Sequence, residues 1–542
     1  MTIKPPDEPQ RPVSRAHGAA PVSGRGLLRS TSVVSVMTLL SRILGLVRDV
    51  VFARYFGATI VMDAFIVANR IPNMLRRFFA EGAFSQGFVP VMARYREQHS
   101  HDEARQLVDA VAGTLGLLLF GITLVGVIAA PLLVLVVAPG FIDENGRFDL
   151  ATAMLRFTFP YLFFVSLTAF AGGILNTYGR FAAPAFTPVI LNVVLIASAL
   201  WLAPLLEEPG MALAYGVLAA GLVQLAFQVP FLARIDAIPR PRWRPRHDGV
   251  RRIGALMLPA IFGSSVAQIN VLLGGIIASM LGVGKISLLY YSDRLMEFPL
   301  GLFGIALATV TLPYLSRQHA SESMRDFART IDWSMRLVLL IAVPSAIGLI
   351  LLAGPLVTTI FYGGAFSADD VRLTAISLQA FALGLIGFSL VKILAPAYFA
   401  REDTLTPVKI GLIALLVNFV LSVALAWWLV AIGYSAPHAG LALAISVAAL
   451  VNAWLLYRGL RRDGVMVHSS GWLAFIARLF AANAAMVAAI YYLMRPLEWW
   501  LQADVAARVF LLSGTIAAAV AVFFAMLLLA GGRLSQLRLH ER

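Results

Sequence analysis

The stretch SRILGLVRD, residues 41–49, places Arg42, Arg48 and Asp49 inside the first long apolar run of the chain. A charged side chain at the centre of a bilayer costs about 3 kcal/mol or more on an isolated helix. Arg42 and Arg48 lie well inside the run, so snorkelling of their side chains to the membrane surface does not easily explain them. A water-filled cavity must therefore shield them, and the excess of arginine predicts that this cavity receives an anion.

The composition is that of a protein with many membrane spans. The chain has 542 residues, of which 59% are hydrophobic and 13% charged, whereas soluble domains carry about 25% charged residues. The net charge of +14 lies mostly in short loops, which indicates a topology determinant rather than a nucleic-acid surface. The absence of cysteine excludes disulfides and Cys-ligated metals, and the histidines show no metal-ligand spacing. We expect no cofactor, no metal and no nucleic-acid partner.

About fourteen apolar runs reach the roughly 20 residues that a membrane-spanning helix needs. They lie near 28–55, 61–93, 106–137, 151–176, 183–205, 211–233, 252–282, 286–315, 331–361, 372–399, 406–432, 438–457, 472–494 and 507–530. The loops between them are too short for a soluble catalytic domain. The sequence therefore predicts an all-α polytopic membrane protein that is a transporter and not an enzyme.

Basic residues mark every second loop. Loops after even-numbered runs carry arginine clusters, as at 234–252 and 458–462, whereas loops after odd-numbered runs are acidic or nearly neutral, as at 143–149. Because basic loops remain on the cytoplasmic side, both termini are expected in the cytoplasm. The polar, basic segment 1–26 has no apolar core like that of a signal peptide, and we expect a disordered tail.

Two further apolar runs carry charges. Residues three or four apart share a helix face, so Arg294 can pair with Glu297, and Asp293 shares a face with Glu297. Arg77 and Glu81 are also four residues apart. The remaining charges in these runs that we single out are Asp63, Arg76, Arg77 and Asp293. One interpretation is that all of them form neutral ion pairs that hold helices together, and it suits Asp49, Asp293 and Glu81 best.

An anion site is the alternative that better explains four arginines inside apolar runs. Guanidinium groups match phosphate oxygens in bidentate fashion and stay charged when partly desolvated, so several of them suit a diphosphate. The four are Arg42, Arg48, Arg76 and Arg294. Asp63 and Glu297 would hold these arginines in place or neutralise them when the site is empty.

Long strings of the sequence resemble the MurJ (MviN) family of lipid II flippases, which belongs to the multidrug/oligosaccharidyl-lipid/polysaccharide exporter superfamily. The matching strings are SRILGLVRD with FARYFGA (41–58), DAFIVANRIPNMLRRFFAEGAFSQGFVPV (63–91), APGF (138–141), YYSDRLMEFPLGLFGIALATVTLP (290–313) and KILAPAYFAREDTLTPVK (392–409). The resemblance covers about residues 27–530, and the N-terminal tail falls outside it.

The resemblance implies fourteen helices in two pseudo-symmetric lobes around a central cationic cavity. Helices 1–6 would form the N-lobe at 27–234, a basic linker would follow at 235–251, and helices 7–12 would form the C-lobe at 252–462. Helices 13 and 14, within 463–542, would form a groove for a polyprenyl tail and precede a basic C-terminus.

The resemblance also implies a substrate and its site. Lipid II, the undecaprenyl-diphosphate-linked disaccharide-pentapeptide, would move from the inner to the outer leaflet of the bacterial cytoplasmic (inner) membrane by alternating access, with other peptidoglycan-synthesis proteins as candidate partners. The family's cavity arginines match Arg42, Arg48, Arg76 and Arg294, and its functional acidic positions match Asp63 and Glu297.

Two other functions stay open at this point. A flippase for another polyprenyl-linked glycan would use the same physics. A cation or drug antiporter of the same superfamily would need an acidic cavity, whereas the charges inside these runs lean basic.

The alternating loop charges make a testable topology. Reporter enzymes fused after Arg246 and after Arg462 should both report a cytoplasmic location, and a fusion after Asp143 should report a periplasmic one. A periplasmic signal from the 234–252 loop would contradict both the span count and the assignment of the cavity.

Overall fold

The computed structural model describes residues 24–78, 82–98, 100–142, 146–301, 324–466 and 471–532. Within these ranges the chain is almost entirely helical, and its β-structure is one isolated bridge between Gly363 and Phe366. In the described residues, ten helical segments are long and apolar enough to cross a membrane: Asp102–Ile128, Arg147–Thr177, Ala182–Leu205, Met211–Ala233, Met324–Leu351, Ala368–Phe399, Leu405–Ala431, Ala439–Arg462, Trp472–Leu493 and Val505–Leu529. The all-α membrane class is confirmed, and the count of fourteen spans stays a prediction.

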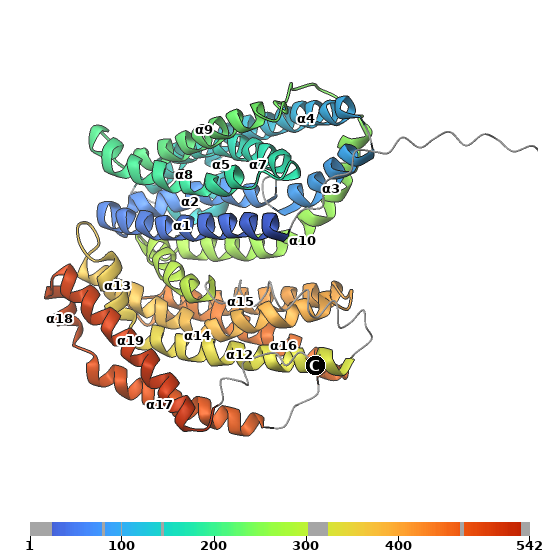
Figure 1. Ribbon diagram of the computed structural model, residues 1–542. Helices are drawn as coiled ribbons and strands as arrows, with labels where there is room; N and C mark the ends of the chain where they lie inside the picture. The colour runs from blue at the N-terminus through green and yellow to red at the C-terminus, as the bar shows by residue number, and fades with distance from the viewer. Residues whose placement is uncertain are drawn as a thin grey trace, which may run out of the picture.

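The first half of the chain folds into one helical bundle, at the top of Figure 1. Its helices are α1 (Gly24–Phe56), α2 (Ile60–Arg76), α3 (Gly82–Gln98), α4 (His101–Ile128), α5 (Ala130–Val137), α6 (Arg147–Thr158), α7 (Tyr161–Thr177), α8 (Ala182–Ala197) and α9 (Met211–Ala233). The most extensive packing pairs α1 with α8, α7 with α9, and α2 with α6. These helices share one continuous buried apolar core.

Some runs that the sequence suggested as single spans are divided by prolines. The run 106–137 breaks between α4 and α5, where Pro131 occupies the first turn of α5. The run 151–176 breaks between α6 and α7 at Pro160. Proline has no N–H to donate and clashes with the preceding turn, so it favours a helix start over a helix interior.

The second half of the chain forms a second bundle, below the first in Figure 1. It consists of α12 (Met324–Leu351), α13 (Ala353–Phe361), α14 (Ala368–Phe399), α15 (Leu405–Ala431) and α16 (Ala439–Arg462). Helix α14 is central, because it packs against both α12 and α16. It starts with a capping box in which Ser367 and Asp370 each bind the other's backbone N–H, which satisfies two otherwise unpaired donors.

Two helices lie between the bundles. Helix α10 (Asp248–Ser279) packs against α3 of the first half and α15 of the second. The helix at 285–301, which has no label in Figure 1, contacts both halves through its side chains. Because α10 touches both bundles, the lobe boundary at residue 252 stays a prediction.

The C-terminal helices cross the outside of the second bundle (Figure 1). Helices α17 (Trp472–Leu493) and α19 (Val505–Leu529) pack on each other, and α17 packs on α12. Between them lies the short helix α18 (Leu497–Gln502), which contacts α13. Helix α18 is not predicted by the sequence pattern, because six residues are too few to show a helical period.

A buried carboxylate joins the two halves at one end. Asp63 of α2 is fully buried and accepts hydrogen bonds from Gly284 N (2.6 Å), Ser287 N (2.9 Å) and Ser287 Oγ (2.6 Å). The first N–H groups of a helix have no partner within it and carry a partial positive charge. Asp63 therefore caps the 285–301 helix from the other half of the molecule, and we call this contact the Asp63 clasp.

Backbone contacts surround the Asp63 clasp. Ala365 N donates to Arg54 O (2.8 Å), and the Tyr291 hydroxyl donates to Gly57 O (3.3 Å). Gly284 has a φ of +79° and lies against the Ala58 carbonyl, where a Cβ would collide, so this position requires glycine. The loop charges predict that this end faces the periplasm, and these contacts hold the two halves against each other here.

The Asp63 clasp predicts that removal of the Asp63 carboxylate loosens the closed end. In Asp63→Ala, the Gly284 and Ser287 N–H groups lose their acceptor, so the closed end should open more often. The chain has no cysteine, so one can be introduced as Leu288→Cys, at a position only 2% exposed. A membrane-impermeant maleimide should label this thiol slowly in the parent and at least several-fold faster with Asp63→Ala.

The matched control is Leu205→Cys, which lies on the side assigned to the periplasm and is 79% exposed. It should react at the same rate in both backgrounds. Equal protection of the thiol at position 288 with and without Asp63 would show that the clasp does not hold this end closed.

Candidate anion site between the two halves

Asp49 of α1 accepts hydrogen bonds or ion pairs from both halves of the protein. Its Oδ1 accepts from Arg48 Nε (3.0 Å), Arg48 Nη2 (2.7 Å) and the Tyr290 hydroxyl (2.8 Å). Its Oδ2 lies 3.5 Å from Arg294 Nε on the 285–301 helix. With 3% of its side chain exposed, Asp49 is an internal counter-ion shared by Arg48 and Arg294.

Arg48 is held by three elements. Besides Asp49, its Nη1 donates to Asn192 Oδ1 of α8 (3.0 Å), and its Nη2 donates to the Tyr290 hydroxyl (3.2 Å). The Asn192 amide is itself fixed, because its Nδ2 donates to Ser41 O (3.0 Å). Helical spacing predicts that Arg48 points away from the face of Asp49, but its long side chain folds back to reach the carboxylate.

Arg294 is the more accessible of the two arginines in this group, which we call the Asp49 cluster: Arg48, Asp49, Asn192, Tyr290, Arg294 and Glu297. Its Nη1 donates to Glu297 Oε2 (3.0 Å), with 38% and 52% of the two side chains exposed, and the pairing expected from the sequence is confirmed. Its guanidinium also stacks on the Tyr290 ring, 5.0 Å from the centroid. Arg294 therefore joins a buried carboxylate to an open face.

Arg42 and Lys392 carry further positive charge beside the cluster. Arg42 lies against Gly301, where any Cβ would collide with its guanidinium. Lys392 of α14 is within electrostatic reach of Glu297 and Arg42, and its Nζ lies 3.5 Å from Leu300 O. Lys392 was not among the predicted site residues, although it is a charged residue inside the apolar run 372–399, the same feature that identified the arginines.

A second pair of opposite charges, both half-buried, lies along the 285–301 helix. Arg70 of α2 projects against Gly275 of α10, which has no Cβ to block it, and it interacts electrostatically with Asp293. Asp293 is also near Glu297 and Arg294. The expected proximity of Asp293 to Glu297 is thus confirmed. The Asp49–Arg294 pair connects the 285–301 helix to α1, and the Arg70–Asp293 pair connects it to α2.

The other predicted residues lie elsewhere on α2. Arg76 Nε donates to Asn73 Oδ1 (3.1 Å) on its own helix, and Arg77 is exposed at the end of α2. Its expected neighbour Glu81 lies outside the described residues. Asp63 is about 20 Å from Arg76 along the helix axis, and its hydrogen bonds go to the 285–301 helix start and not to an arginine. The structure therefore separates the Asp63 clasp from the Asp49 cluster.

Tyr290 and Asn192 are the members that sequence reasoning missed. Tyr290 belongs to the string YYSDRLMEF, but a tyrosine in an apolar helix usually only packs. Asn192 is a lone amide in the run 183–205, and only the folded structure shows that it faces Arg48.

The arrangement favours anion binding over catalysis. Apart from Lys285 and Asp63 at its start, the 285–301 helix has five cations on or beside it, Arg42, Arg48, Arg70, Arg294 and Lys392, and three carboxylates, Asp49, Asp293 and Glu297. In the described part of the chain, no group of three or more His, Cys, Asp or Glu residues is placed to hold a metal ion. The excess positive charge can be satisfied by an anionic ligand that replaces Asp49 as a partner of the guanidinium groups.

Comparison with known proteins identifies relatives over most of the chain. The family model "Lipid II flippase MurJ" matches residues 52–511. A protein from Vibrio cholerae named "Probable lipid II flippase MurJ" is 46% identical over 519 residues, which is 94% of this chain and 98% of that protein.

Solved structures show the same fold. A structure of lipid II flippase MurJ in an inward closed conformation superposes with a TM-score of 0.74 at 26% identity, covering 91% of this chain and 97% of that one. An inward-facing multidrug resistance transporter of the MATE family in the MOP superfamily gives a TM-score of 0.63 at 14% identity, covering 78% and 95%, and this likeness concerns the fold alone. The match to the family over most of the sequence, together with a relative 46% identical almost from end to end, shows that the chain belongs to the MurJ family of lipid II flippases.

Proposed function

We propose that this protein moves lipid II from the inner to the outer leaflet of the bacterial cytoplasmic membrane by alternating access, with both termini in the cytoplasm. Family membership and the many apolar spans support the activity and the membrane. The single observation that carries the mechanism is the sharing of Asp49 between Arg48 of α1 and Arg294 of the 285–301 helix.

The diphosphate of lipid II is the group that binds to these arginines. In the empty site, Asp49 and Glu297 together balance the charges of Arg48 and Arg294, which keeps two guanidinium groups stable inside the membrane. A diphosphate brings more negative charge than one carboxylate, and it can accept hydrogen bonds from both guanidinium groups at once. Arg42 and Lys392 add charge on the same side, and Arg76 at the far end of α2 contacts the diphosphate in a later position.

Movement of the two halves relative to each other then exposes the lipid II head group on the periplasmic side of the membrane. A ligand shifts a conformational equilibrium only by as much as its affinity differs between the two states. Arg48 and Arg294 sit on different halves, so their spacing changes as the halves rock, and the diphosphate binds best at one spacing. The Asp63 clasp keeps the periplasmic end closed until this happens.

The polyprenyl tail stays in the membrane along the last two helices. Helices α17 and α19 pack on the outside of the second bundle and carry few charges. Their surfaces are strongly apolar and exposed, as at Phe480 (75%) and Phe510 (83%). A groove beside them suits the tail, because the tail then never leaves an apolar environment.

The rival functions fit the site less well. A cation antiporter needs unpaired carboxylates facing its substrate, whereas the most buried carboxylate of the cluster, Asp49, already accepts from two arginines. A flippase for another polyprenyl-diphosphate glycan shares the diphosphate chemistry. Family membership favours lipid II over that alternative.

Removal of single arginines tests diphosphate binding. A charge-assisted hydrogen bond contributes about 1.5–3 kcal/mol, so Arg48→Ala or Arg294→Ala should weaken lipid II binding about 10- to 100-fold. Neither variant should complement loss of the native flippase, although both should accumulate in the membrane. Lysine at either position should restore activity only in part, because it keeps the charge and loses the fork.

The exposed Arg180→Ala is the matched control and should bind lipid II and complement like wild type. Alanine variants at positions 48 and 294 that bind lipid II with wild-type affinity would contradict the proposed contact.

A double variant separates substrate binding from charge neutralisation. If Arg294 serves only to neutralise Glu297, then Arg294→Ala combined with Glu297→Ala should regain activity, because no unpaired charge remains between them. Asp49 keeps Arg48 and Tyr290 as partners in this variant. Diphosphate binding predicts that the double variant stays inactive in a lipid II transport assay, and recovery at normal expression would exclude a phosphate contact for Arg294.

A further inference from the structure

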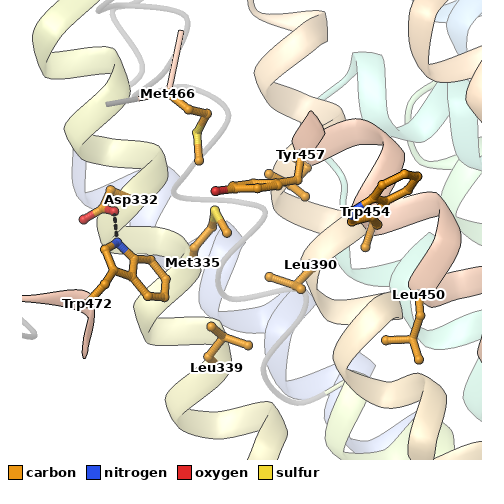
Figure 2. Close-up of a pocket in the computed structure, with 11 residues that line it drawn as sticks. Asp332, Met335, Leu339, Leu390, Leu450, Trp454, Tyr457, Met466 and Trp472 are labelled. Carbon is orange, nitrogen blue, oxygen red and sulfur yellow. Dashed lines mark hydrogen bonds between the residues drawn. The ribbon is translucent and has the colours of Figure 1, made fainter. Parts of the chain in front are cut away.

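A groove on the second bundle lies apart from the charged site. Figure 2 shows helices α12 and α16 on its two sides and Leu390 of α14 between them. Its volume is about 320 Å³, at the lower end of the roughly 300–1,000 Å³ typical of small-molecule sites. Leu450 and Trp454 on its α16 side are 39% and 54% exposed, so the groove opens to the outer surface of the bundle.

The groove is apolar and runs along the helices for about two turns. Its lining covers residues 332–339 on α12 and 450–457 on α16, which is about 10 Å along each helix axis. Acyl chains of membrane lipids run in the same direction as spanning helices. The lining residues lie toward the start of α12 and the end of α16, the ends that the basic loops assign to the cytoplasm, so the groove faces the inner leaflet.

The carboxylate in the lining is already neutralised. Asp332 Oδ1 accepts from Trp472 Nε1 (2.6 Å), as drawn in Figure 2. Asp332 Oδ2 lies 3.2 Å from Arg336 Nε, and the Arg336 guanidinium lies over the Trp472 ring, 5.0 Å from its centroid. Asp332 therefore does not repel an anionic ligand, and Trp472 closes one side of the groove.

Positive charge stands beside the groove at its cytoplasmic end. The exposed Arg458 lies one turn beyond Trp454, with its guanidinium 5.3 Å from the centre of that ring. Asp463, a nearby carboxylate, pairs with Arg401 (3.0 Å), and no carboxylate in the described ranges lies within ion-pair distance of Arg458. Arginine near the cytoplasmic leaflet attracts anionic lipid head groups.

We propose that this groove binds one acyl chain of an anionic inner-leaflet phospholipid, with the head-group phosphate beside Arg458. The apolar walls accept the chain, the neutralised Asp332 tolerates the negative charge, and Arg458 supplies the counter-charge. A polyprenyl chain is a poorer occupant, because a groove of two helical turns would leave most of so long and branched a chain outside. This site is separate from the Asp49 cluster and serves a lipid that is not transported.

The test is a lipid titration of the purified full chain, followed by native mass spectrometry with phosphatidylglycerol. Leu390→Trp fills the groove and should weaken the tightest phosphatidylglycerol site at least tenfold. The matched control Leu416→Trp makes the same change on α15 at a position 62% exposed and should bind as wild type. Arg458→Gln should weaken phosphatidylglycerol about fivefold and leave zwitterionic phosphatidylethanolamine unchanged.

Folding is checked by the thermal unfolding midpoint in lipid-free detergent. If Leu390→Trp does not fold, Ala453→Phe fills the same groove from α16, and if neither folds, Arg458→Gln decides. Wild-type affinity for phosphatidylglycerol in a folded filled variant, or in Arg458→Gln when neither filled variant folds, overturns the proposal. Undecaprenyl phosphate that displaces phosphatidylglycerol from wild type but not from Leu390→Trp would also overturn it, because the groove would then belong to the polyprenyl chain.

Discussion

The sharing of one buried carboxylate by two arginines from different halves is the interaction on which the rest of the structure depends. Asp49 stabilises Arg48 and Arg294 inside the membrane, where an unpaired charge would cost about 3 kcal/mol or more. The same arrangement leaves both guanidinium groups able to exchange partners, because Arg294 also reaches the accessible Glu297. A balanced resting state and a strong anion site thus come from the same four side chains, Arg48, Arg294, Asp49 and Glu297.

The 285–301 helix connects the Asp49 cluster to the Asp63 clasp at the closed end. Its start is capped by Asp63 of α2, and about 10 Å further along its Arg294 meets Asp49 of α1. The helix is thus fastened twice to the first bundle, while Leu288 packs among residues of the second bundle. Any change in the partners of Arg294 acts on the element that also forms the closed end. This gives a direct physical route from ligand binding to the opening of that end.

The outer surface is apolar, whereas the region between the two halves is rich in charged side chains. The charges inside the runs are gathered between the halves or paired, and the exposed faces of α15, α17 and α19 are apolar because lipid is their solvent. The groove between α12 and α16 has both features, because its walls are apolar, its Asp332 is neutralised and an arginine lies at the membrane surface. The charged groups of the Asp49 cluster and of this groove are thus placed where other protein groups pair with them or where the membrane surface is near.

The amino-acid sequence was enough to predict the all-α membrane class, the ten apolar spans that the described residues contain, and the presence of charged side chains inside apolar runs. These follow from run length, loop charge and the energetic cost of arginine in lipid, which are local properties of the chain. The Arg294–Glu297 pair was also readable, because both residues lie on one helix face. Only the tertiary structure decided that Asp49 serves two halves, that Asn192 and Tyr290 fix Arg48, and that Asp63 caps a helix instead of holding an arginine. These contacts join residues 144 to 245 positions apart, and helical periodicity fixes which face a residue occupies but not which distant helix packs against that face.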